Sequence, residues 1–277
     1  MIYLDFSFQE ILDYKNNPLM LNFLVKNQLS QITSFPVDFR KKQVTSLFMI
    51  SEIPVISRRE PEKIISEFLE KYLKDKILFN YHKKNYEIKI QKLWENRKKL
   101  AEKLKVPLYV VFWNDENVIL FEYYPNKNFQ IMPWKQYVEK FNRLKSLSRQ
   151  TKPLMYARKS LFNQILEKYN VTGGGDLDGF LVKKNEIVIF EFSTRNVSCD
   201  KILNHNINYF INEDKRRWEA LFILKENLSN SNVKTRVNVI IWSPCCKEFL
   251  LVNRDLKKEN GKIVFDHKFK LTNRTNR

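Results

Sequence analysis

Glycine is scarce in this chain, with 5 residues among 277, and its scarcity excludes several functions. Neither a Walker-type phosphate loop nor a dinucleotide-binding glycine motif is present. Four of the five glycines fall between Gly173 and Gly179. Glycine is required where φ is positive or where another group approaches the backbone closely. The cluster therefore marks 173–179 for closer inspection, although a flexible helix-to-strand connection would use glycine in the same way.

Cysteine and long apolar runs are also rare. Cys199, Cys245 and Cys246 lack metal-ligand spacing, and adjacent cysteines seldom bridge, so a reducing cytoplasm is the simplest expectation. The longest apolar runs, such as 108–113, are far shorter than the ~20 residues of a membrane span. The first ten residues lack a basic segment followed by an apolar stretch, which argues against a secretory signal. We expect a cytoplasmic protein without membrane segments.

Positive charge is abundant. Lys and Arg total 49 against 31 Asp and Glu, a formal net charge of +18. An AT-rich genome would raise Lys and Asn and lower Gly, but it would also supply acids, so it does not create this excess. A phosphate backbone is the natural partner of such a field, because binding releases condensed counterions. The composition thus predicts a nucleic-acid-binding protein.

The residue pattern alternates between helical and strand periodicity, which predicts an α/β protein with a mixed central sheet flanked by helices. The expected helices are 61–72, 93–105, 134–147, 154–169 and 213–227. The expected strands are 76–81, 86–90, 108–113, 118–123, 180–182, 187–192, 236–242 and 248–252.

The chain divides into an N-terminal α/β region, 1–150, and a region containing the candidate site, 151–277. Each half contains a helix, a hairpin, a second helix and two strands, in that order. This repeated order is explained either by a degenerate tandem duplication or by the usual order of elements in α/β proteins. By elimination, 1–150 would contain the residues that recognise bases. Residues 1–59 suggest no chemistry, and 254–277 is either a basic arm or a frayed end.

Three carboxylates give the glycine-rich segment a chemical meaning. Asp176 and Asp178 are separated by one residue, so in an extended segment they point to the same face and repel unless a cation or proton lies between them. Glu191 interrupts the apolar run 187–192, where a buried charge requires a partner or a metal. A hairpin places Asp178 beside Glu191, and such oxygen ligands suit Mg²⁺, with Mn²⁺ as a substitute.

These residues resemble the motif of the PD-(D/E)XK nuclease superfamily, which includes most type II restriction endonucleases. Asp178 matches the first acid of the motif and Glu191 the second, within a similarity that spans about 154–252. The resemblance implies a restriction-endonuclease-like core and Mg²⁺ held by these two acids. It also implies hydrolysis of DNA, with double-stranded DNA as the expected partner, and a homodimer if both strands of a symmetric site are cut. An upstream helix of the family often supplies a further Glu, for which Glu167 is the candidate.

Ser193 stands where the family places a catalytic Lys, which orients the attacking water and stabilises charge on the phosphate. Three explanations remain open. Another base such as Lys159, Lys183 or Arg195 takes its place, the metal alone suffices, or the site is inactive. Arg195 and Lys159 are also the candidates for nucleic-acid contacts, and Asp176 would assist the metal ligands.

A second candidate lies in the N-terminal half. Glu87 and Lys89 form an intact acid-x-Lys triplet, and Asp75 precedes them across an expected hairpin. Such triplets arise often by chance in a chain with 29% charged residues, so an exposed strand face is the alternative. The first turn of the helix at Asp214–Trp218 contains arginines that could contact phosphate or simply face solvent.

The sequence as a whole predicts a Mg²⁺-dependent DNA endonuclease of restriction type. Two alternatives remain: a decayed nuclease fold that binds nucleic acid without cutting it, and a nuclease for RNA or branched DNA.

Overall fold

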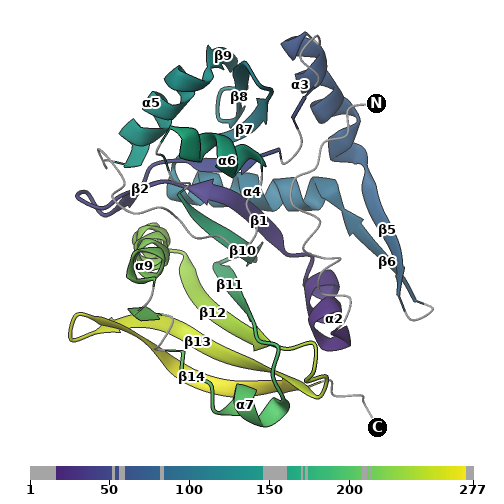
Figure 1. The fold of residues 1–277 in the computed structure, drawn as a ribbon, viewed down its shortest axis with the longest axis vertical. Coiled ribbons are helices and arrows are strands. Elements are labelled where there is room, and N and C mark those ends of the chain that lie inside the picture. The colour runs from purple at the N-terminus through teal and green to yellow at the C-terminus, as the bar shows by residue number, and fades with distance from the viewer. Residues whose placement is uncertain are drawn as a thin grey trace. The chain divides into compact units, whose positions relative to one another are not determined.

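The computed structural model describes residues 17–51, 54–55, 60–81, 84–145, 161–169, 171, 174–207, 211–212 and 214–272. Its ten-stranded mixed open sheet and flanking helices confirm the expected α/β class (Figure 1). The chain forms two compact units, and most residues of five strands belong to each. The described residues of unit 1 fall within 32–75 and 90–176, and those of unit 2 within 17–31, 76–89 and 177–272. Among the described helices, none combines the length and apolar character that a membrane crossing needs.

Unit 1 contains a sheet of order β1-β4-β7-β8-β9. These strands are β1 (Ser30–Phe35), β4 (Leu47–Ile50), β7 (Leu108–Trp113), β8 (Asn117–Tyr124) and β9 (Phe129–Pro133). Only β4 and β7 are parallel, and the other neighbouring pairs are antiparallel. Between β1 and β4 the chain forms a small ribbon of β2 (Val37–Asp38) and β3 (Gln43–Val44). Between β4 and β7 lie α3 (Pro61–Glu70), η2 (Tyr72–Lys74) and α4 (Ile90–Leu104). After the sheet come α5 (Trp134–Lys145) and α6 (Leu161–Lys168).

The central strands β4 and β7 of unit 1 are apolar on both sides because helices supply core on both faces. Phe68 of α3 and Trp94 of α4 meet edge to face on one side. On the other, Trp113 packs against Trp134 of α5 and Phe162 of α6. Continuous apolar strands are typical of sheets covered in this way. This explains why β7 has the bounds predicted from its apolar run.

Unit 2 contains a sheet of order β10-β11-β12-β13-β14. These strands are β10 (Gly175–Val182), β11 (Glu186–Thr194), β12 (Lys234–Trp242), β13 (Phe249–Glu259) and β14 (Lys262–Thr272). Again only the second and third strands, β11 and β12, are parallel. They are connected through α7 (Cys199–Leu203) and α9 (Lys215–Asn230). The unit also includes α2 (Pro18–Asn27) and a separate ribbon of β5 (Lys76–Tyr81) and β6 (Lys84–Lys89).

Alternation along β11 separates the two faces of this sheet. Phe190 packs into a core with Leu19 and Met20 of α2, whereas its neighbour Glu191 points to the opposite face. Helix α9 contacts β12 and buries Trp218, Leu221 and others of its residues. Asn17 fixes α2, since its side chain accepts hydrogen bonds from the first turn and donates two to the connection between β12 and β13.

Three features differ from the sequence expectations. Most of the glycine-rich segment is itself strand, because β10 already begins at Gly175. Residues 254–272 are not a frayed arm, because they pair as β13 and β14 over most of their length. Cys199 is joined to Cys246 by a disulfide instead of being reduced, while Cys245 is an exposed free thiol. Long-range pairing causes all three differences.

Candidate active site

Asp178 and Glu191 lie side by side on the β10–β11 hairpin. The register pairs Gly179 with Phe190, and one step further along this antiparallel ladder Asp178 is opposite Glu191. Opposite residues of an antiparallel pair project to the same face. The two carboxylates therefore share the face of the sheet that is opposite the α2 core, as the sequence pattern predicted.

Arg217 of α9 brings a positive charge to both acids. Its Nη2 lies 3.4 Å from Asp178 Oδ2 and also donates a short hydrogen bond to Glu191 Oε2. Glu191 is buried, with 3% of its side chain exposed, whereas Asp178 is 16% and Arg217 35% exposed. The acids thus lie beneath a cation that remains in contact with solvent.

Helix α9 is suited to hold this cation. Asp214 precedes its first residue, and the Asp214 side chain accepts a hydrogen bond from the Arg217 backbone N–H at 3.4 Å. Trp218, next along the helix, is buried and packs edge to face on Phe265 of β14. The N-terminal end of a helix carries partial positive charge, which adds to that of Arg217.

The backbone also supports the acid pair. The N–H of Phe192 donates to Asp178 Oδ2 at 2.9 Å, so this oxygen contacts both a backbone donor and Arg217.

Close packing explains part of the glycine cluster, because a Cβ at Gly174 or Gly175 would lie under 3.0 Å from Phe35. Close approach, and not positive φ, is therefore what requires glycine at these two positions.

The remaining predicted residues occupy varied positions. Asp176 and Ser193 are each two residues from an acid of the pair and share its face by alternation; Asp176 is exposed and Ser193 half-buried. The Arg195 N–H donates to the carbonyl of Trp242. Lys183 forms an exposed ion pair with Glu186 at 3.8 Å.

Two further predictions concern residues elsewhere in the chain. Glu167 is half-buried on α6 of unit 1. Lys159 lies outside the described residues.

The second candidate site lies on a two-stranded ribbon that is separate from the ten-stranded sheet. Glu87 and Lys89 belong to the two-stranded ribbon β5–β6, where Glu87 forms an exposed ion pair with Lys76 at 3.4 Å. Lys89 is exposed, as is Asp75, which ends the short helix η2. These positions fit an exposed strand face, the alternative that the composition already suggested.

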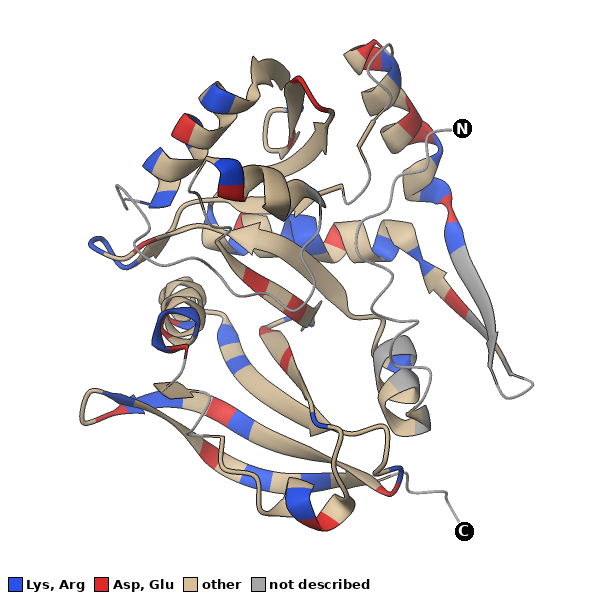
Figure 2. Cartoon of the chain, viewed as in Figure 1, with Lys and Arg blue, Asp and Glu red and all other residues tan. Residues whose placement is uncertain are grey.

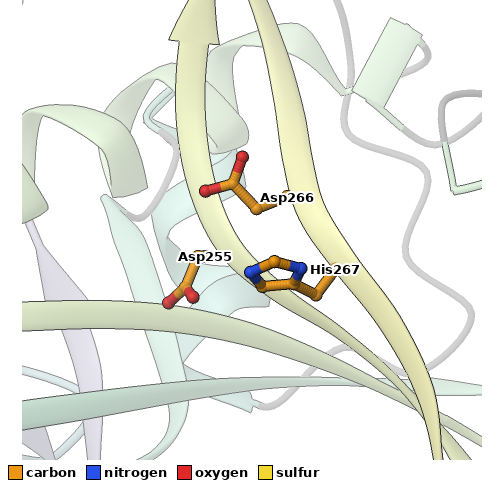
Figure 3. A group of neighbouring side chains, drawn as sticks. All are labelled: Asp255, Asp266 and His267. Carbon is orange, nitrogen blue, oxygen red and sulfur yellow. The ribbon is translucent and has the colours of Figure 1, made fainter.

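A third cluster of potential ligands lies on β13 and β14. Asp255, Asp266 and His267 offer ligand atoms within 4.8 Å of one another (Figure 3). Lys257 already pairs with Asp266, and this hydrogen bond holds the pKa of the Asp266 carboxyl below its usual value. Because Asp266 and His267 are exposed and an internal cation is already present, we assign no metal to this group.

Asp178 and Glu191 are the residues that could hold a divalent cation. One carboxylate oxygen from each of these two adjacent strands contacts Nη2 of Arg217. Mg²⁺ is commonly bound through one or two carboxylates together with water. The buried Glu191 also needs a positive partner. The donor type therefore fits Mg²⁺, and in the structure the cation at these oxygens is the guanidinium of Arg217.

Sequence reasoning identified the acids but not the role of Arg217. It named the arginines at the start of this helix as possible phosphate contacts and sought the missing cation at Lys159, Lys183 or Arg195. Arg217 is 26 residues from Glu191 in the chain, and only the return of α9 over the sheet brings them together.

Comparison with known proteins adds no assignment: no family model matches the chain, and no curated protein matches it significantly.

Proposed function

We propose that this chain is a Mg²⁺-dependent endonuclease that hydrolyses DNA phosphodiester bonds, of restriction type and acting as a homodimer. The observation that carries the proposal is the convergence of Asp178 and Glu191 on a single cationic nitrogen. This arrangement joins the resemblance to the PD-(D/E)XK motif, which these two acids match. The parallel strand β12, reached through α9, completes the local unit around them.

Each residue has a defined task in this proposal. Asp178 and Glu191 would hold Mg²⁺, and Asp176 would assist from the exposed end of β10. When bound there, Mg²⁺ would supply Lewis acidity at the phosphate and a more acidic water. Arg217 carries the positive charge that Ser193 cannot provide, and a guanidinium suits phosphate because its donors form a planar fork.

The charge of the chain fits a polyanionic substrate. The net charge is +18, and Figure 2 shows Lys and Arg along β13 and β14 and at the start of α9, interspersed with acids. Near the end of β11, burial lowers the pKa of His205, and the charges of Arg195 and Lys268 lower it further. Arg195 and Lys268 therefore bring two positive charges close to the neutral imidazole of His205, where a phosphate backbone would be favoured.

A binding protein without nuclease activity is the second candidate. One observation favours it: Arg217 already pairs with both carboxylates, while Ser193 replaces the expected Lys. In that case Asp178 and Glu191 would serve only to hold α9 on the sheet. The positive charge would then account for the whole function.

Cleavage of supercoiled plasmid DNA separates the two candidates. The wild-type protein should cut with Mg²⁺ or Mn²⁺ and not with EDTA, and Asp178→Asn should abolish cutting. Asp200→Asn, which removes an exposed carboxylate from α7, is the matched control and should cut normally. Binding without cutting under every metal condition would rule out the nuclease. Duplex, single-stranded, branched and RNA substrates would define the substrate class.

A further inference from the structure

Arg217 is placed where it must compete with any divalent cation for the acid pair. The same nitrogen, Nη2, contacts Asp178 and Glu191, so the guanidinium neutralises both. A divalent ion sharing these two oxygens would bring positive charge to the same position. Two cations that contact the same pair of oxygens repel each other. Arg217 and a divalent ion on these oxygens therefore compete for the acids.

The three side chains differ in their freedom to move. Glu191 is on a strand with neighbours on both sides and is almost fully buried, and Asp178 is held by the Phe192 N–H. Arg217 is on the first turn of α9 and more than a third of its side chain faces solvent. Its long side chain can change rotamer without moving the helix, whose next residue Trp218 is anchored. Displacement would therefore move the arginine and not the acids.

From this geometry we infer that Arg217 is an internal counter-cation that a divalent ion displaces, and that the released guanidinium binds a phosphate of the nucleic acid. The inference rests on the proposed function and adds regulation to it. A polyanion that attracts Arg217 leaves the acids available, and a bound metal leaves Arg217 available for phosphate. Metal and nucleic acid consequently bind with positive coupling, and linkage requires that each raises the affinity of the other by the same factor.

The test measures Mn²⁺ affinity from the electron paramagnetic resonance signal of free Mn²⁺. Without nucleic acid, Arg217→Gln should bind Mn²⁺ on the order of tenfold more tightly than wild type, within the usual range of coupling between sites. Arg216→Gln is the matched control, because it removes the same charge from an exposed neighbour, and it should behave like wild type. Glu191→Gln should bind Mn²⁺ weakly, both in the wild-type protein and when combined with Arg217→Gln.

The second part adds a phosphorothioate DNA duplex, with Glu191→Gln used to subtract Mn²⁺ bound by the duplex itself. Wild type and Arg216→Gln should gain affinity for Mn²⁺ by about the factor that Arg217→Gln already shows. Arg217→Gln should gain little. Equal affinities of the Arg217 and Arg216 variants without DNA, or equal gains with it, would overturn the inference.

Thermal unfolding gives a readout that does not depend on activity. Loss of Arg217 leaves two acids without this cation, so the variant should melt lower than wild type and Mn²⁺ should raise its Tm by more. Arg217→Met, which keeps an unbranched side chain, repeats the measurement if the Gln variant does not fold. A Mn²⁺-induced shift no larger than that of wild type would contradict the inference.

The inference and the nuclease proposal fail in different ways. If the Mn²⁺ affinities are as expected but plasmid DNA is not cut, the displaceable arginine is supported and the nuclease proposal is ruled out. If the wild-type protein cuts plasmid DNA but Arg217→Gln has unchanged Mn²⁺ affinity, the nuclease proposal is supported and the displaceable arginine is ruled out.

Discussion

The two compact units have sheets of the same design and different chemistry. In each, five strands lie in chain order, and only the second and third are parallel. The second strand of unit 1, β4, consists of four buried apolar residues, whereas the second strand of unit 2, β11, carries Glu191. The first strands differ likewise, since β10 contains acids and β1 contains none.

The comparison shows that this sheet can be built without buried carboxylates. Taking a charge out of water costs free energy that an ion pair often fails to recover. An apolar residue in place of Glu191 would therefore stabilise the fold as well as Glu191 does, as the apolar strand β4 of unit 1 illustrates. Folding alone therefore does not require the acid pair.

The sharpest test of this difference compares Asp178 with the ribbon residue Glu87. Asp178→Asn retains an oxygen that can accept the hydrogen bond from Phe192 but removes the charge, so plasmid cleavage should fall by roughly a thousandfold or more. Glu87→Gln removes an exposed charge and should leave the rate within about twofold. Initial rates of plasmid nicking measure both. Loss of cleavage in Glu87→Gln alone would move the site to the ribbon.

Unit 2 should depend on its disulfide. Cys199 and Cys246 are 47 residues apart, and closing a loop of that length in the unfolded chain stabilises the fold by about 2–4 kcal/mol. Cys199→Ser should therefore lower the free energy of unfolding in urea by this amount. Cys245→Ser, which removes the exposed thiol, serves as the control and should change it little. Equal stability of the two variants would show that the bond does not form in solution.

The glycines of the two units should respond differently to alanine. A Cβ at Gly174 would lie 2.7 Å from the backbone of Phe35, so Gly174→Ala forces a shift of the main chain and should cost about 2–3 kcal/mol. Gly261, in the β13–β14 turn, has open space around it but a φ of +77°, so Gly261→Ala should cost about 1 kcal/mol. Chemical denaturation would show both effects. The reverse order would contradict the close packing at Gly174.

The smallest expected effect distinguishes the buried Lys145 from the half-buried Lys225. Burial lowers the pKa of Lys145 in unit 1 from 10.5 to about 8. Between these two pH values the unfolded chain holds a proton that the folded chain has lost, so stability rises with pH. Lys145→Met should remove this rise and stabilise the protein at pH 7 by on the order of 1 kcal/mol.

Lys225 of unit 2 provides the contrast, since its Nζ donates a hydrogen bond to the carbonyl of Leu256. Lys225→Met should destabilise the protein instead, by about 1 kcal/mol. Unfolding curves at pH 7 and pH 10 measure both variants. A Lys145→Met protein with an unchanged pH dependence would contradict the effect of burial on this lysine.

Elements with local patterns were predictable in this chain. The apolar run 108–113 is strand β7 with the same bounds, and Pro61 begins α3 as expected. The apolar run 187–192 identified Glu191 as a charge in a buried strand, and the spacing to Asp178 placed both acids on one hairpin. Each of these features depends on residues that are close together in the chain, where side-chain periodicity and turn length determine the geometry.

Features that depend on distant pairing were not predictable. Strand β14 looked like a basic tail because its half-buried and exposed residues become a strand only when paired with β13. The disulfide joins the start of α7 to the connection after β12, and no spacing rule indicated it.

The sequence by itself determined the α/β class, the positive charge and the two acids that face each other on the β10–β11 hairpin. Only the tertiary structure decided which cation meets them. Arg217 is 39 residues from Asp178, and its position depends on where α9 packs as the chain crosses from β11 to the parallel strand β12. Local periodicity fixes the face of a strand, whereas the partner on that face is chosen by packing between elements that are distant in the sequence.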